Sequence, residues 1–179
     1  MRVDFAPEML TVRFLLGVVA ACLPPMHGLL AADAPEMTVS QYGTYAAGIV
    51  SLVPDPQSPN AARARIGDYV FLEATYDICA RIGVNFGFEL RRGAHAPGAK
   101  LHLDVAIQHP PVHGVDGRIH LREHYEYDVM DQPLLLGWMY RHSNTLVAGE
   151  WSWTVTDGRG ALVTRQSFHV ETDCPVPMA

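Results

Sequence analysis

The chain contains few charged residues and no cluster of basic ones. Charged residues make up 18% of the 179 residues and hydrophobic residues make up 49%, a balance that argues against a disordered chain and against a coiled coil. The formal net charge is -6, with arginine and lysine scattered along the chain. Because nucleic-acid binding needs a basic stripe or patch, we expect no nucleic-acid partner. The length predicts one globular domain.

Motifs that identify common enzymes are also absent. The sequence has no Gly-x-Ser-x-Gly segment and no glycine-rich phosphate loop between a strand and a helix. The acidic pairs Glu123 with Glu126 and Asp128 with Asp131 are ordinary features of a strand and the turn that follows it. We therefore predict no catalytic residue and no cofactor, and we favour a protein that is not an enzyme.

The N-terminal apolar run is too short for the ~20 residues that a membrane span needs. Residues 14–21 are uncharged and apolar, they follow Arg13, and Pro24 and Pro25 interrupt the run. This pattern is typical of the core of a secretory signal peptide. We predict that residues 1–34 are a signal peptide removed on export, and that the mature chain has no stable membrane span.

The start and the processing of this segment have alternatives. A start at Met9 would remove two acidic residues from the region that is positively charged in signal peptides. Small residues at 32–34 favour plain cleavage near Ala34, whereas residues 19–22 resemble the lipobox of bacterial lipoproteins. We expect a periplasmic or extracellular protein or, with the second kind of processing, one anchored by a lipid on Cys22.

Beyond the predicted signal peptide, apolar residues recur at every second position, which is the period of strands with one buried face. Residues 69–78 and 82–91 show this period over long stretches, and so do residues 101–107, where Pro110 and Pro111 are expected to end the strand. The predicted apolar faces are Val70, Leu72, Ala74, Tyr76 and Ile78; Ile82, Val84, Phe86, Phe88 and Leu90; Leu101, Leu103, Val105 and Ile107; and Ile119, Leu121, Tyr125, Tyr127 and Val129.

A hairpin near the C-terminus is the clearest local signal. Residues 151–155 and 162–170 alternate as strands, and two glycines in the connecting segment 157–160 allow the positive φ that such turns require. The apolar segment 134–140 is consistent with a short helix or a buried strand, because periodicity cannot decide so short a run.

Seven or eight short strands, without helices long enough for βαβ crossovers, favour an all-β immunoglobulin-like antiparallel sandwich, with a closed barrel as the alternative. We place an N-terminal strand and a proline-rich loop in residues 35–67 and the sandwich core in residues 68–179. The last strand runs parallel to the first in such folds, so Cys79 and Cys174 should emerge at the same end. Because Cys22 lies in the predicted export segment, these two form an even pair, and we predict a disulfide between them.

Four segments carry a resemblance to a known family. They are Tyr-Gly-Thr-Tyr at 42–45, Ala-Arg-Ile-Gly-Val-Asn-Phe-Gly-Phe at 80–88, Gly-Glu-Trp at 149–151 and Phe-His-Val at 168–170. In order and spacing they resemble a bacterial family catalogued as domain of unknown function 3859, over about residues 42–170. The resemblance implies a sandwich-like β domain, implies no activity and brings no site residue.

The nine histidines raise a metal-binding hypothesis. In an extended strand His120 and His124 would lie ~13 Å apart, too far to share one ion. His109 and His113 flank a proline-containing segment and could converge, with His102 or Asp116 as a further ligand. We keep His102, His109 and His113 as metal-site candidates, against solvated histidines on a polar sheet face.

Exposed aromatic residues would offer a surface for a sugar ring or a protein partner. We therefore expect an exported β-sandwich acting as a binding or structural module in the cell envelope, with an unknown protein or a glycan as partner. The alternative is a histidine-based metal-binding periplasmic protein. The aromatic candidates are Tyr69, Phe71, Tyr140, Trp138, Trp151 and Trp153, although tryptophans commonly fill the core instead.

Overall fold

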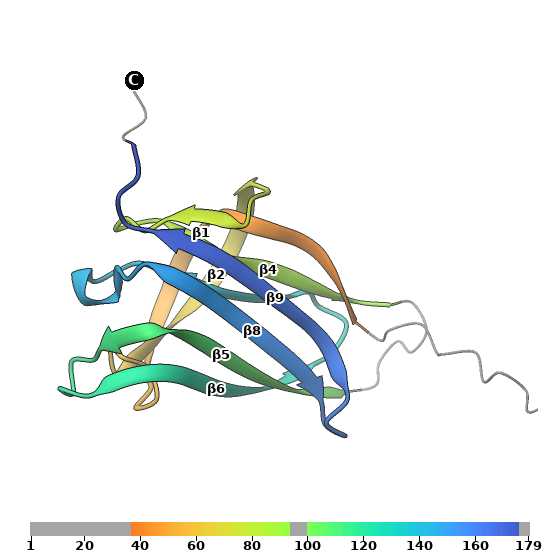
Figure 1. The fold of residues 1–179 in the computed structure, drawn as a ribbon. Helices are drawn as coiled ribbons and strands as arrows, with labels where there is room; N and C mark the ends of the chain where they lie inside the picture. Colours follow the sequence, from red (N-terminus) through yellow and green to blue (C-terminus); the bar gives the residue numbers. More distant parts are fainter. Residues whose placement is uncertain (1–36, 94–99, 176–179) are drawn as a thin grey trace, which may run out of the picture. The chain divides into compact units, whose positions relative to one another are not determined.

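The computed structural model describes residues 37–93 and 100–175. In this part of the chain nine strands form two sheets, so the predicted all-β sandwich is confirmed with nine strands in place of seven or eight. Figure 1 shows the two sheets packed as layers. The predicted signal peptide, its alternative start and Cys22 lie outside the described residues. No helix within the described ranges is long and apolar enough to cross a membrane. The elements are β1 (Met37–Pro54), β2 (Ala62–Glu73), β3 (Asp77–Cys79), β4 (Asn85–Arg92), β5 (Leu101–His113), β6 (Ile119–Val129), β7 (Leu134–Met139), the 3-10 helix η1 (Ser143–Thr145), β8 (Gly149–Asp157) and β9 (Leu162–Glu171).

The two sheets have four and five strands. The four-stranded sheet has the order β2-β1-β4-β7 with antiparallel neighbours, and the five-stranded sheet has the order β3-β9-β8-β5-β6. In the second sheet β3 and β9 run parallel and the other neighbours run antiparallel. Both β2 and β6 are therefore edge strands, each with a row of backbone groups that no neighbouring strand pairs.

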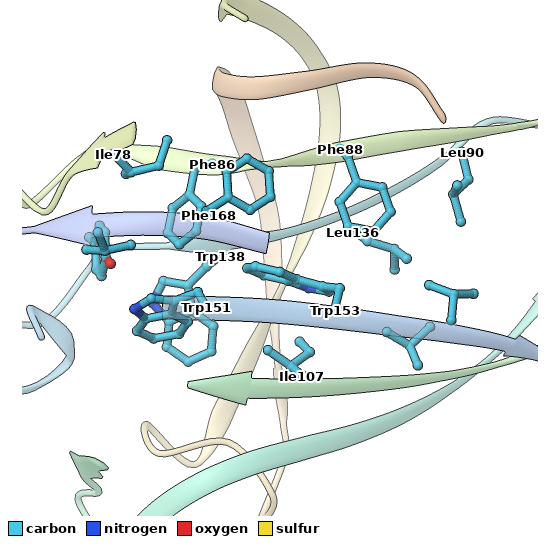
Figure 2. Close-up of a cluster of buried hydrophobic side chains, with 14 of the residues drawn as sticks. Ile78, Phe86, Phe88, Leu90, Ile107, Leu136, Trp138, Trp151, Trp153 and Phe168 are labelled. Atoms are coloured by element: carbon cyan, nitrogen blue, oxygen red, sulfur yellow. The ribbon is translucent and has the colours of Figure 1, made fainter. Parts of the chain in front are cut away.

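An aromatic cluster between the two sheets forms the core (Figure 2). Phe86 on β4 packs edge-on against Trp151 and Trp153 on β8, with ring centroids 5.9 and 5.7 Å apart, and against Phe168 on β9 at 5.3 Å. All four side chains are fully buried. Burial of one phenylalanine contributes roughly 1.5–3 kcal/mol, so this cluster is a major source of the sandwich's stability.

Several of the predicted strands are confirmed in type but differ in extent. The segment 82–91 begins as a strand only at Asn85, and Ile82 lies exposed in the preceding turn, whereas the later apolar residues of this segment face the core. The ambiguous segment 134–140 is a strand, β7, which pairs with β4. The predicted C-terminal hairpin is formed by β8 and β9.

The predicted strand 69–78 is wrong in its continuity and in its buried face. Between β2 and β3 the chain leaves the four-stranded sheet and enters the five-stranded one. Val70 and Leu72, predicted to face the core, are 66% and 68% exposed. At residues 69–72 both alternating faces are apolar, so a period of two cannot decide which one is buried. The rings of Tyr69 and Phe71 pack against β1 instead.

The prediction that two prolines end the strand near residue 110 is also wrong. β5 continues through Pro110 and Pro111 to His113, with a register shift in its pairing with β6 between Gln108 and Val112. Proline has no N–H for a ladder hydrogen bond, and a bulge is where a sheet tolerates it. The irregularity therefore lets the strand pass the prolines.

The inner face of β6 contains a carboxyl group that the predicted apolar face omits. Tyr125 and Tyr127 are half-buried on this face as predicted, and Glu123, two residues earlier, is fully buried on it. Ile119 and Leu121, predicted to be inward, are exposed because they lie beside the irregular end of β5. The buried stretch of β6 therefore starts with an acid.

β1 bends along its length and changes its partner. Its first half pairs with β4 and its second half with β2, with register shifts in both ladders; such bulges bend and twist a strand. Gly43 adopts φ 117°, and a Cβ there would lie 1.9 Å from the carbonyl oxygen of Glu73, so only glycine is accommodated. In Figure 1 the β1–β2 hairpin crosses the strands of the five-stranded sheet at a steep angle.

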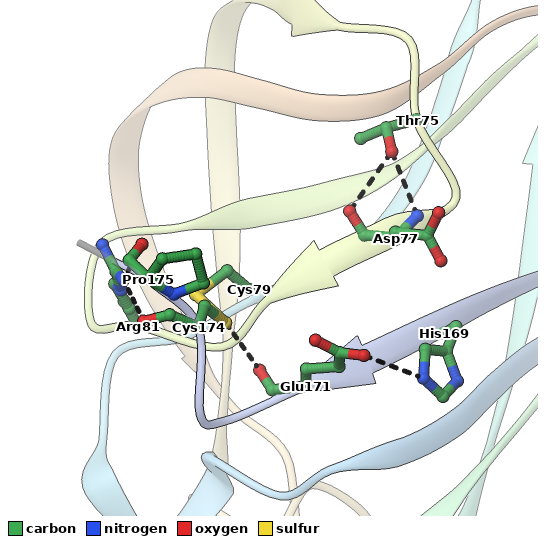
Figure 3. Close-up of a disulfide and its surroundings, with 8 residues drawn as sticks. All are labelled: Thr75, Asp77, Cys79, Arg81, His169, Glu171, Cys174 and Pro175. Atoms are coloured by element: carbon green, nitrogen blue, oxygen red, sulfur yellow. Dashed lines mark hydrogen bonds and ion pairs between the residues drawn. A yellow bond between two sulfur atoms is a disulfide. The ribbon is translucent and has the colours of Figure 1, made fainter. Parts of the chain in front are cut away.

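A disulfide joins Cys79 at the end of β3 to Cys174 beyond β9, with their Cα atoms 5.9 Å apart (Figure 3). The parallel pairing of β3 with β9 brings both cysteines to the same end of the sandwich, as the sequence predicts. Arg81 donates hydrogen bonds to the carbonyl oxygens of Cys174 and Pro175, both at 2.9 Å. The chain beyond β9 is thus held by a covalent bond and by a charged side chain.

Candidate ligand-binding site

A cavity of about 970 Å³ lies between the β1–β2 hairpin, β7 and the β5–β6 side of the other sheet, and we name it the hairpin cavity. Its volume is at the upper end of the ~300–1,000 Å³ that is typical of small-molecule sites. Polar and apolar side chains share its wall. The charged and aromatic residues in the lining include Arg63, Arg65 and Tyr69 from β2; Glu123, Tyr125 and Tyr127 from β6; Trp138 from β7; Arg141 just after β7; and Trp153 from β8.

Arg63 ties the hairpin to the opposite sheet. Its guanidinium carbon lies 4.9 Å from the ring centre of Tyr125 and 5.9 Å from that of Tyr127, both on β6. Its Nε lies 4.0 Å from Asp55 Oδ2 in the loop between β1 and β2. A cation over an aromatic face contributes about 0.5–2 kcal/mol. Side chains thus fasten β2 to β6, which no backbone ladder joins in the described part of the chain.

Glu123 is a buried carboxyl group in the cavity wall. Its side chain is 2% exposed, and it accepts a hydrogen bond from the Tyr125 hydroxyl on Oε2 while Oε1 has no hydrogen-bond partner among the described residues. Burial raises the pKa of Glu123 to about 7; the Tyr125 hydrogen bond opposes this, Asp55 adds to it and Arg63 opposes it. A carboxyl group with a pKa near neutrality in a cavity wall is a candidate functional group.

His109 on β5 lies behind Glu123. Its ring stacks on Trp151 with centroids 4.8 Å apart, and burial lowers its pKa against the effect of a backbone hydrogen bond. Its Nδ1 lies 2.8 Å from the Pro110 carbonyl oxygen and donates to it, so Nε2 of the neutral ring is an acceptor. That Nε2 lies 3.8 Å from Glu123 Oε1. Two acceptors therefore face each other unless one of them carries a proton, which couples their titrations.

A second buried acid anchors the hairpin to its own sheet. Glu89 on β4 accepts hydrogen bonds from the side chains of Ser40 on β1, Tyr69 on β2 and Arg91. Burial acts to raise the pKa of Glu89, but the three hydrogen bonds and the Arg91 charge outweigh it and the pKa is lowered. In contrast to Glu123, both oxygens of Glu89 have partners, so we assign it a structural role.

Two arginines in the cavity wall have no partner. Arg65 on β2 and Arg141 after β7 are exposed, and neither side chain makes a hydrogen bond or an ion pair with a described residue. Together with Arg63 they give the described lining three arginines, and Glu123 is its only acidic residue. The cavity therefore carries excess positive charge.

The three predicted metal candidates do not meet. His102 lies on the outer face of the five-stranded sheet, His109 is buried on the inner face, and His113 is exposed at the end of β5. At ~3.3 Å per residue along a strand, His109 lies roughly 23 Å from His102 and roughly 13 Å from His113. One ion cannot contact all three.

His102 belongs instead to a group of side chains on the outer face of β5 and β6. His102, Asp104 and Glu126 offer ligand atoms that all lie within 4.8 Å of one another. His124 Nε2 lies 3.7 Å from Asp104 Oδ1, and Asp128 Oδ1 lies 3.1 Å from His102 Nδ1. The hydrogen bond to Asp128 raises the pKa of His102. These side chains are accessible to water and paired with one another.

The predicted aromatic surface is mostly core. Trp151, Trp153 and Tyr140 are fully buried and Trp138 is nearly so, although Trp138 and Trp153 also line the cavity. Of the six candidates, only Tyr69 and Phe71 are half-buried.

Glu123 is not among the predicted site residues, although the sequence contains a signal for it. It occupies the same alternation phase as Tyr125 and Tyr127, and an acid in the apolar phase of a strand is the pattern of a buried carboxyl group. Arg65 and Arg141 have no such signal, because only the fold brings them to one cavity.

The two packed sheets define an immunoglobulin-like sandwich. The crystal structure of an immunoglobulin-like protein from Pseudomonas aeruginosa has a similar fold, with a TM-score of 0.54 and 19% identity, and the match covers 78% of this chain and 99% of that chain. The chain belongs to the family described as Domain of unknown function (DUF3859), whose model matches residues 34–170. This confirms the resemblance found in the sequence. No curated protein matches the chain.

Proposed function

We propose that this chain is an exported binding module of the cell envelope that holds a small ligand in the hairpin cavity. The observation that carries the proposal is Glu123, a buried carboxyl group with one oxygen unpaired in the wall of a cavity of about 970 Å³. A buried acceptor without a partner costs about 1–3 kcal/mol. A cavity with a few convergent polar groups is the usual form of a ligand site.

Two features support the exported location. The apolar run at 14–21, with its proline-containing end, has the pattern of a signal peptide. The bridge between Cys79 and Cys174 suits an oxidising compartment such as the periplasm or the cell surface. Lipidation of Cys22 is the alternative route to the same envelope location.

A variant that fills the cavity tests the proposal. Ala64 on β2 lines the cavity, so Ala64→Trp should occupy it, whereas Ala161→Trp in the exposed turn between β8 and β9 is the matched control. A mixture of soluble metabolites and short saccharides would be screened by saturation-transfer NMR against both variants and the parent chain. We expect compounds that bind the parent and the control but not Ala64→Trp. A screen in which no compound distinguishes the two variants would contradict the proposal.

The second candidate function is binding of a divalent metal at His102, Asp104 and Glu126, because their ligand atoms lie within 4.8 Å of one another. Titration calorimetry with zinc on tag-free chain should then give heat that His102→Ala removes. His169→Ala, which changes an exposed histidine on β9, is the matched control. Equal heats for both variants, or none for the parent, would contradict this candidate.

A further inference from the structure

The charges in the hairpin cavity indicate the charge of its ligand. Three arginines line the cavity: the side chains of Arg65 and Arg141 make no hydrogen bond or ion pair with a described residue, and Arg63 Nε lies 4.0 Å from Asp55 Oδ2. The one acid in the described lining, Glu123, is buried, and burial favours its neutral form. A cationic ligand would meet like charges here, whereas a carboxylate can form charge-assisted hydrogen bonds with a guanidinium. The charge pattern therefore favours an anion.

Hydrogen-bonding groups in the wall make a purely alkyl anion a poor ligand. Glu123 Oε1 has no hydrogen-bond partner among the described residues, and the exposed side-chain amide of Gln132, which also lines the cavity, makes no hydrogen bond with a described residue. An alkyl chain would bury these groups without partners, which costs free energy for each of them. A ligand hydroxyl both donates and accepts, so it can bond to the carboxyl group of Glu123, protonated or ionised, and to the amide of Gln132.

Flat apolar surfaces complete the description of the ligand. The rings of Tyr69 on β2 and of Tyr125 and Tyr127 on β6 line the same cavity as the arginines and are only half-buried. Side chains of this kind combine a broad apolar face with a polar atom at the rim. A compact ring with hydroxyl groups at its edge and a carboxylate matches all of these features.

We propose, on the basis of the proposed function, that the ligand of the hairpin cavity is an acidic saccharide of the uronic acid type. Its carboxylate pairs with Arg65 and Arg141, and its hydroxyl groups bond to Glu123 and to the neighbouring polar side chains. Of the two partner classes expected from the sequence, this proposal commits to the glycan.

The test compares three probes by titration calorimetry at low salt. The first is trigalacturonate, the second is the same trisaccharide with its carboxylates methyl-esterified, and the third is octanoate, an anion without hydroxyls. Loss of one charge-assisted hydrogen bond weakens binding by about tenfold or more. We expect trigalacturonate to bind at least about tenfold more tightly than either of the other probes, and added salt to weaken it.

Matched variants locate the anion site. Arg65→Gln and Arg141→Gln should each weaken trigalacturonate binding by about tenfold. Arg122→Gln, which removes the same charge from an exposed residue of β6 outside the cavity lining, should leave it unchanged. Ala64→Trp should abolish it.

The outcomes separate this inference from the proposed function. If the ester or octanoate binds as tightly as trigalacturonate and Ala64→Trp removes that binding, the acidic-saccharide inference is wrong and the cavity remains the binding site. If none of the three probes binds, the inference is also wrong, and the library screen with Ala64→Trp and Ala161→Trp decides the proposed function. Equal weakening by Arg122→Gln would likewise overturn the inference.

Discussion

The guanidinium of Arg63 on β2 lies 4.9 Å from the centre of the Tyr125 ring on β6, so the edge strand of one sheet is fastened to the edge strand of the other. No backbone ladder joins these two strands in the described residues. The contact holds the β1–β2 hairpin over the cavity that contains Glu123. Four predictions follow from the contacts around this cavity and from the sandwich that carries it.

Arg63→Met should loosen the hairpin. The variant keeps a long unbranched side chain but removes the cation over Tyr125 and the pairing with Asp55. We expect faster amide exchange in residues 49–66 and a loss of about 0.5–2 kcal/mol in unfolding free energy. Hydrogen-exchange mass spectrometry measures the first effect. Arg65→Met, on the same strand but without a partner, is the control. The same acceleration in both variants would show that Arg63 does not fasten the hairpin.

The buried carboxyl group should make stability fall as pH rises. Glu123 has a pKa of about 7 in the folded chain against 4.5 for the ordinary group, so between these values the folded state binds more protons than the unfolded state. Its contribution to the unfolding free energy is therefore present below pH 4.5 and is lost through pH 7. Across this pH range the contribution of Glu123 to the unfolding free energy falls by roughly 3 kcal/mol.

Glu123→Gln removes this titration and keeps an acceptor for Tyr125. Between pH 4.5 and pH 8, we expect the unfolding free energy of the variant to rise relative to that of the parent chain by up to roughly 3 kcal/mol, measured by urea unfolding. The pKa of His109 is lowered, which gives the opposite trend, but His109 is present in both chains. A stability difference that stays constant with pH would refute the prediction.

Gly87→Ala should be strongly destabilising. A Cβ at Gly87 would lie 2.2 Å from the carbonyl oxygen of Leu136 on β7, and relief would require the backbone of β4 or β7 to move. Overpacking of this kind costs roughly 1–3 kcal/mol. Gly48→Ala, on β1, meets no atom within 4 Å and is the control. Urea denaturation of both variants measures the difference, and equal midpoints would contradict the close approach of β4 and β7.

Reduction of the bridge between Cys79 and Cys174 should destabilise the sandwich. The bridge closes a long loop, with the two residues 95 positions apart, and removal of a native disulfide typically costs about 2–5 kcal/mol. Urea unfolding of a chain that begins after the predicted signal peptide, with and without reductant, measures this. Cys79→Ser should show the loss in full and no further effect of reductant. Two alkylatable thiols in the parent chain would contradict the bridge.

Alternation predicts the sandwich where the two faces of a strand differ in polarity. Phe86 and Phe88 alternate with small or polar residues and are buried as predicted, and so is the hairpin that contains Trp151 and Trp153. Alternation fails to predict the buried face at Val70 and Leu72, because Tyr69 and Phe71 make the other face equally apolar. There the packing of the bent β1 decides the face, and bulges leave little trace in the sequence.

The candidate site is predictable only in part for a similar reason. Glu123 is visible as an acid in the apolar phase of β6, whereas Arg65 and Arg141 line one cavity only because the hairpin crosses from one sheet towards the other. For the histidines, in contrast, nearness in the sequence does not mean nearness in the fold. His102 and His109 are seven positions apart on one strand, so they lie on opposite faces of the sheet.

The indole signals of the three tryptophans test the central claim most directly, because Trp138 and Trp153 line the hairpin cavity and Trp151 does not. The chain would be labelled with ¹⁵N at tryptophan and titrated with trigalacturonate. A ligand in the cavity should shift the Trp138 and Trp153 signals more than that of Trp151, and Ala64→Trp should abolish these shifts. Binding that moves Trp151 alone, or that leaves all three signals in place, would contradict the account.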